Sequence, residues 1–167
     1  MSIVVLLGGL TMSFGLSEPG DDRSPADTFQ VRVVGPTKPV RADEATFEVV
    51  VSTDLGEPQK FSYTDFPLTF GAYVLGPWGA VEPTPNGDRP RRWITMEHSS
   101  AKIVKIAKGQ PFRVVLKLSD YYPTADREAF RPGDYQVNVK FYSASLKMER
   151  PTDSGPVAFK IVAADPK

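Results

Sequence analysis

From Phe29 to the end of the chain, apolar and polar residues alternate with a period of two in one short segment after another. This period places successive side chains on opposite faces, as in a β-strand with one buried face. The segments that carry the pattern, strongly or weakly, are 29–33, 47–52, 61–66, 68–75, 92–96, 102–106, 112–118, 135–141 and 157–161. No segment carries a sustained helical stripe. We therefore predict an all-β fold, an antiparallel β-sandwich or an open barrel of about seven to nine strands.

Composition narrows the possible functions. Sixteen prolines and thirteen glycines in 167 residues favour short strands joined by loops, and the length suits one domain, predicted over 28–167. Basic and acidic residues balance at twenty each, which argues against a nucleic-acid partner. There is no cysteine, and the one histidine, His98, lies in a polar segment that predicts an exposed turn. Thiolate metal sites and cysteine nucleophiles are therefore excluded, and we expect no cofactor and no enzymatic activity.

The first 17 residues need a separate interpretation. An apolar run over 3–10 precedes small residues at Gly15 and Ser17, which is typical of a secretory signal, although no Lys or Arg precedes the run. An extra first strand is the alternative, weakened by the glycine pair Gly8-Gly9. The run is too short to span a membrane. We expect a secreted, periplasmic or cell-envelope protein, peripheral to the membrane or free of it, with 18–27 as a solvated linker.

A corner motif favours a sandwich over a barrel. Gly133 lies two residues before Tyr135 and Val137 two residues after it, at the start of a regularly alternating segment. This arrangement resembles the tyrosine corner of immunoglobulin-like and fibronectin type III-like sandwiches, in which the hydroxyl bonds to an upstream backbone group. Val137 then occupies the place that a cysteine holds in antibody domains. The resemblance implies an immunoglobulin-like β-sandwich in which Gly133 and Tyr135 have a structural role. The alternative is an ordinary turn entering any strand, and the regular alternation after Tyr135 favours the corner.

The order of segments 109–122 and 132–137 also resembles the amino-terminal sandwich domain of deuterolysin-type (aspzincin) metallopeptidases. The similarity covers 29–143 as a pattern, with few matching letters. The catalytic half has no counterpart, because no His-Glu-x-x-His motif is present. The resemblance therefore implies the fold and an accessory or inhibitory role, not peptidase activity.

The segment 76–93 is the candidate partner-binding loop, because long connections without secondary structure are uncommon in compact domains and often functional. Tryptophan and arginine are frequent at binding hot spots, and Arg91 or Arg92 is placed to stack on a tryptophan. The alternatives are that Trp93 starts a strand and fills the core, and that Trp78 packs under its own loop. The candidate residues are Trp78, Asn86, Arg89, Arg91, Arg92 and Trp93.

Three carboxylates at Asp120, Asp126 and Glu128 lie near Tyr121 and Tyr122. Their spacing does not match an EF-hand loop, so we interpret the segment as a solvated connection and predict no metal site.

Two hypotheses for the function of the chain remain. The first is a non-catalytic exported module that binds an unknown protein or cell-surface partner through its loops. The second is a protease-inhibitor-like or accessory domain of an extracellular peptidase system.

Overall fold

The computed structural model describes residues 28–64, 69–84, 102–126, 128–142 and 151–163. Within these ranges the protein is an all-β sandwich, as the alternation predicts, with two short 3-10 helices, η1 (Ala42–Glu44) and η2 (Leu118–Asp120). The strands among the described residues are β1 (Gln30–Val34), β2 (Thr46–Ser52), β3 (Gln59–Tyr63), β4 (Phe70–Gly76), β5 (Gly79–Ala80), β6 (Lys102–Ile106), β7 (Phe112–Lys117), β8 (Gly133–Phe141) and β9 (Thr152–Ile161).

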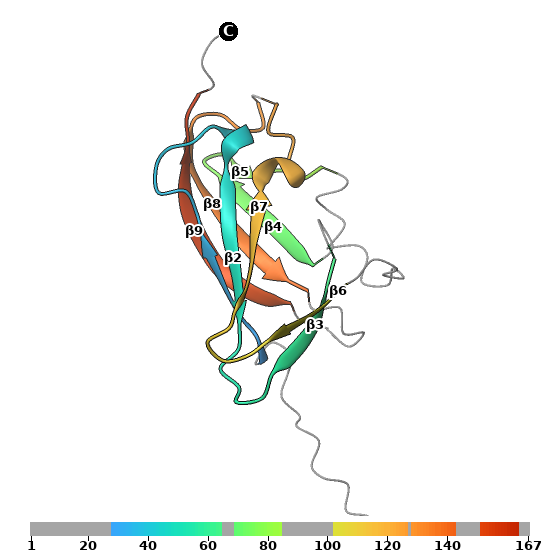
Figure 1. Ribbon diagram of the computed structural model, residues 1–167. Coiled ribbons are helices and arrows are strands. Elements are labelled where there is room, and N and C mark those ends of the chain that lie inside the picture. Colours follow the sequence, from blue (N-terminus) through green and yellow to red (C-terminus); the bar gives the residue numbers. More distant parts are fainter. Residues whose placement is uncertain (1–27, 65–68, 85–101, 127, 143–150, 164–167) are drawn as a thin grey trace, which may run out of the picture.

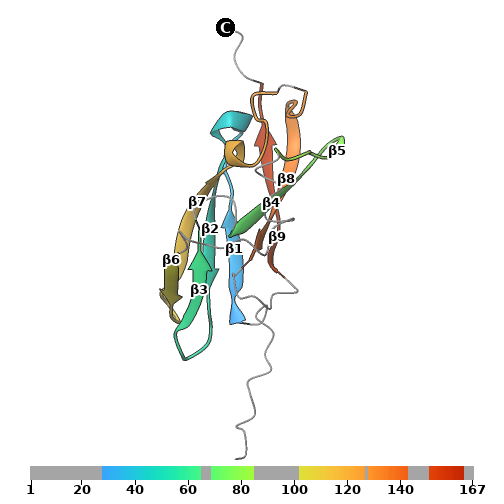
Figure 2. The ribbon, with the colours of Figure 1, turned by 90° about the vertical axis from the view of Figure 1, so that its right-hand side faces the viewer.

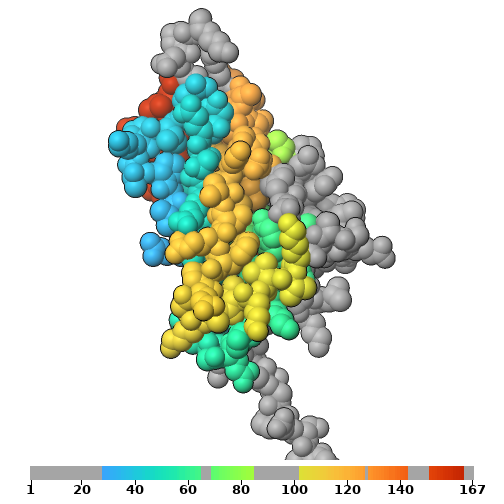
Figure 3. Space-filling model, in the orientation of Figure 1, coloured from blue at the N-terminus to red at the C-terminus, as the bar shows by residue number. Residues whose placement is uncertain are grey.

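The strands form three antiparallel sheets, in the orders β1-β2-β7, β3-β6 and β5-β4-β8-β9. Figure 2 shows two layers, with β2, β7, β3 and β6 on one side and β4, β8 and β9 on the other. Figure 1 shows the layers face-on, one in front of the other. In the same orientation in Figure 3, β2, β7 and β6 form much of the surface that faces the viewer. The four-stranded sheet therefore has one face on the core and one face turned away from the other layer.

The chain after β1 crosses to the second layer. Val40 forms a parallel bridge with Ile161 of β9. Its N–H donates to the carbonyl of Lys160 (3.0 Å), and its carbonyl accepts from the N–H of Val162 (3.0 Å). These bonds tie the β1–β2 connection to the edge of the four-stranded sheet.

Aromatic rings fill one end of the core. The ring of Phe141 lies 5.5, 5.0 and 5.4 Å, centroid to centroid, from the rings of Phe29, Phe61 and Phe70. Phe141 comes from β8, whereas Phe61 and Phe29 lie in or next to strands of the other two sheets, so the cluster joins the sheets. Burial of one such side chain contributes about 1.5–3 kcal/mol, and packing of this kind stabilises a domain that has no disulfide.

The structure corrects several predicted boundaries. Leu118 is buried as expected but lies in η2 rather than in a strand, and β9 starts at Thr152 rather than at Val157. The segment 76–93 was expected to lack secondary structure, yet it contains β5. The predicted strand 92–96 lies outside the described residues.

Candidate functional site

Of the predicted partner-binding residues, the structure describes Trp78. The others lie outside the described residues, as does His98: they are Asn86, Arg89, Arg91, Arg92 and Trp93. Trp78 sits in the tight turn between β4 and β5, with 66% of its surface exposed. The alternative of a tryptophan packed under its own loop is therefore wrong for this residue.

The turn that carries Trp78 rests on the tyrosine corner. A Cβ at Gly76 would lie 2.6 Å from Cε1 of Tyr135, and a Cβ at Gly133 would lie 2.9 Å from Cγ of Pro77. Both distances are shorter than carbon atoms tolerate, so glycine at these two positions lets the β4–β5 turn approach the start of β8. The corner thus supports the two residues that precede Trp78, Gly76 and Pro77.

The corner has the hydrogen bond that the sequence predicts. The Tyr135 hydroxyl donates to the backbone carbonyl of Arg131 (2.7 Å), four residues upstream. The same arginine extends its guanidinium over the Trp78 ring, 5.5 Å from the centroid, and forms an ion pair with Glu128. Arg131 therefore connects the corner to the exposed indole, whereas the sequence pointed to Arg91 or Arg92 for this contact.

Two segments close the edge of β4. The Val74 N–H donates to the Tyr122 hydroxyl (3.0 Å), which in turn donates to the carbonyl of Ala72 (2.9 Å). Further along, the Val81 N–H donates to the Val74 carbonyl (3.0 Å), and the Thr84 N–H donates to the Tyr121 carbonyl (2.8 Å). The 81–84 segment is thereby fixed between β4 and the loop that follows η2.

These tyrosines overturn part of one prediction. Tyr121 and Tyr122 were assigned to a solvated connection, but each is only 1% exposed. Burial, and secondarily the nearby Asp120 carboxylate, raises the pKa of Tyr121 above its ordinary value. Among the described residues, no three acidic or histidine side chains gather closely enough to hold a metal ion.

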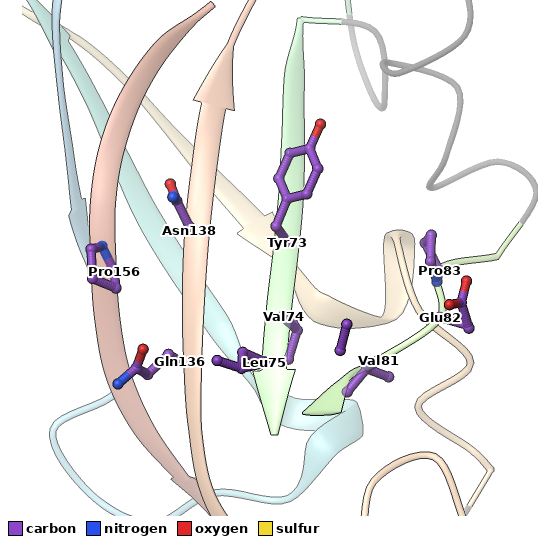
Figure 4. A pocket seen from close by; sticks show the side chains of 10 residues that line it. Tyr73, Val74, Leu75, Val81, Glu82, Pro83, Gln136, Asn138 and Pro156 are labelled. Carbon is purple, nitrogen blue, oxygen red and sulfur yellow. The ribbon is translucent and has the colours of Figure 1, made fainter. Parts of the chain in front are cut away.

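A groove of about 330 Å³ lies on the outer face of the four-stranded sheet. We call it the sheet groove; Figure 4 shows that β4, β8 and β9 contribute its floor and the 81–83 segment its side wall. Its lining residues are Tyr73, Val74, Leu75, Ala80, Val81, Glu82, Pro83, Gln136, Asn138 and Pro156. Leu75 is 52% exposed, and the Tyr73 ring lies under the Lys140 ammonium (4.9 Å to the centroid). The groove combines apolar surface with two side-chain amides.

A second groove, of about 460 Å³, lies beside the tyrosine corner; we call it the corner groove. It is lined by Gly76, Trp78, Gly79, Ala80, Val81, Glu82, Pro123, Asp126, Glu128, Ala129, Arg131 and Tyr135. Both grooves share Ala80, Val81 and Glu82, so they adjoin along one short segment. Their volumes fall within the range of ligand-binding sites in proteins.

Most of this surface was missed by sequence reasoning. Gln136, Asn138 and Pro156 alternate with core residues in β8 and β9, which marks them as outward-facing but not as neighbours. The pairing of β8 with both β4 and β9 brings them together.

Comparison with known proteins adds no family. No family model matches the chain, and no curated protein is significantly similar to it. In the described part of the chain, no helix has the length and apolar character needed to span a membrane.

Proposed function

We propose that this protein is a non-catalytic β-sandwich module that binds a protein or cell-surface partner through Trp78 and the adjoining grooves. The observation that carries the proposal is the exposure of Trp78 on a turn that packs against Tyr135 and Gly133. Tryptophan is enriched at binding hot spots, and Trp78 lies in a groove that adjoins the one lined by the exposed Leu75. A fixed turn also loses little conformational entropy on binding.

The proposal includes an immunoglobulin-like type of sandwich. Its strand orders support this, because β1-β2-β7 corresponds to strands A, B and E of that fold, and β5-β4-β8-β9 to C′, C, F and G. Tyr135 near the start of β8 stands where strand F carries the tyrosine corner, and buried Val137 stands in the place of the cysteine. In this comparison β3 is an additional strand, and β6, in the place of D, pairs with it rather than with β7.

Export to the periplasm, the cell envelope or the medium is part of the same proposal. It rests on the apolar run over 3–10 and the small residues that follow it. Mass spectrometry of the protein from its native cells tests it, since a mature chain starting close to residue 18 is the expected product.

A partner-capture experiment tests the binding function. The purified protein, Trp78→Ala and Ile103→Ala would each be used as bait for native cell-envelope extract. Ile103 on β6 is the matched control, because it is 67% exposed and lines neither groove. The protein that the wild type captures would then be purified and its affinity for each bait measured. We expect it to bind wild type and Ile103→Ala equally and Trp78→Ala at least about 10-fold more weakly. Equal binding of all three proteins would contradict the proposal.

The inhibitor-like alternative is second because it requires an extended loop that enters a peptidase cleft. The first part of that loop is instead folded into β5 and the bonded 81–84 segment. Slowing of a peptidase by the purified protein, together with cleavage mapped to 76–92, is the result that would favour it.

A further inference from the structure

We propose that the partner presents an extended, positively charged segment, which lies across the corner groove and the sheet groove. This inference rests on the proposed binding function and specifies the chemistry of its ligand. It is carried by the charge and shape of the two grooves.

The corner groove is acidic. Its lining includes the carboxylates of Glu82, Asp126 and Glu128 against the single guanidinium of Arg131. Arg131 is already engaged, because it pairs with Glu128 and covers the Trp78 ring. Neither Glu82 nor Asp126 has an ion-pair partner among the described residues. The corner groove therefore carries a net charge of about −2 (three carboxylates less one guanidinium), whereas the sheet groove shares Glu82 and lies beside the Lys140 ammonium.

Charge also selects between a foreign partner and a second copy of this chain. A two-fold symmetric contact through the grooves would bring the same acidic lining of two copies together. Like charges brought together at an interface are unfavourable, whereas complementary charges accelerate and orient association. The acidic lining thus favours a cationic partner over self-association.

The shape of the surface favours an extended segment. The two grooves adjoin at Ala80–Glu82 and continue from the tyrosine corner onto the outer face of β4 and β8. Exposed apolar side chains stand beside the carboxylates, with Trp78 at the corner and Leu75 on the sheet. In an extended peptide, alternate side chains project to the same side. A segment whose groove-facing positions, every second residue, carry both Lys or Arg and apolar side chains would match both kinds of surface.

Three fluorescein-labelled peptides of equal length test the inference by fluorescence anisotropy with the full chain. In all three, serine fills every second position, and the positions between alternate leucine with a test residue, which is lysine, glutamine or glutamate. We expect the lysine peptide to bind at least about 10-fold more tightly than the glutamate peptide, with the glutamine peptide between them. Binding of the lysine peptide should weaken as NaCl rises, because exposed charges are screened.

Charge-neutral variants locate the site. Glu82→Gln/Asp126→Asn keeps the shape and removes the two carboxylates that have no ion-pair partner among the described residues, so the lysine peptide should bind at least about 5-fold more weakly. Glu57→Gln/Asp153→Asn is the matched control, because both carboxylates are exposed and line neither groove. It should bind like the wild type.

Three outcomes would overturn the inference. They are equal binding of the lysine and glutamate peptides, equal weakening by the control double variant, and a homodimer in light scattering that Trp78→Ala abolishes. The proposed function is judged separately, by whether the captured native partner depends on Trp78. Dependence on Trp78 without preference for the lysine peptide would reject the cationic segment and leave the binding function standing.

Discussion

The ring of Tyr135 occupies the space where any side chain at Gly76 would begin, 2.6 Å from the position of a Cβ. This contact joins the start of β8 to the end of β4, and it lies directly beneath the turn that carries Trp78. The tyrosine corner inside the sandwich therefore packs against the same turn that presents Trp78, the candidate binding residue, on the surface.

Gly76→Ala should destabilise the fold by about 1–3 kcal/mol, because the new methyl group must displace a buried ring. Urea unfolding followed by circular dichroism measures the loss. Gly56→Ala is the control, since a Cβ there meets nothing within 4 Å, and it should change the free energy of unfolding by less than about 1 kcal/mol. Equal effects of the two substitutions would refute the steric explanation.

Tyr122→Phe should cost about 1–3 kcal/mol of unfolding free energy. The lost hydroxyl leaves the Val74 N–H and the Ala72 carbonyl without their partner in a buried place. Tyr73→Phe is the comparison, because its hydroxyl meets the Tyr142 hydroxyl (2.7 Å) in a partly buried place. We expect the second substitution to cost less, and the reverse order in urea unfolding would count against the role given to Tyr122.

Phe141→Ala should cost about 3–5 kcal/mol, because it removes a fully buried ring that contacts three others. Trp78→Ala should change stability by no more than about 0.5 kcal/mol, since its ring is mostly exposed. Thermal unfolding of both variants checks the contrast. A large loss for Trp78→Ala would assign the indole to the core rather than to binding.

Stability should fall at alkaline pH. Burial raises the pKa of the Tyr121 phenol above its ordinary value of 10.0, so above about pH 10 the unfolded chain gives up a proton that the folded chain keeps. The contribution is complete below pH 10 and is lost as the pH rises beyond it. Urea unfolding between pH 8 and pH 11 should show this decline, and Tyr121→Phe should make it shallower. An unchanged slope in Tyr121→Phe would assign the decline to other groups.

The strands could be predicted from the sequence because alternation is a local signal. In β8, for example, Tyr135, Val137, Val139 and Phe141 face the core as expected, and β6 has the predicted bounds. The hydrogen bond of Tyr135 to Arg131 was also predictable, since it spans four residues.

Other features depend on contacts between distant residues. Tyr122 bonds to backbone groups 48 and 50 residues away, and nothing in its own neighbourhood indicates an inward direction. The strand β5 has only two residues, too few to show a period. Arg131 meets Trp78 through the packing of the corner, so local sequence favoured the nearer arginines instead.

The hydroxyl of Tyr122 has a consequence for the behaviour of the protein in concentrated solution. An open strand edge offers unpaired N–H and carbonyl groups to any neighbouring chain and is a starting point for aggregation. Along β4, one phenol satisfies a donor and an acceptor that would otherwise require another strand. The edge of β4 therefore stays closed to other chains only while both Tyr122 and the bonded 81–84 segment are in place.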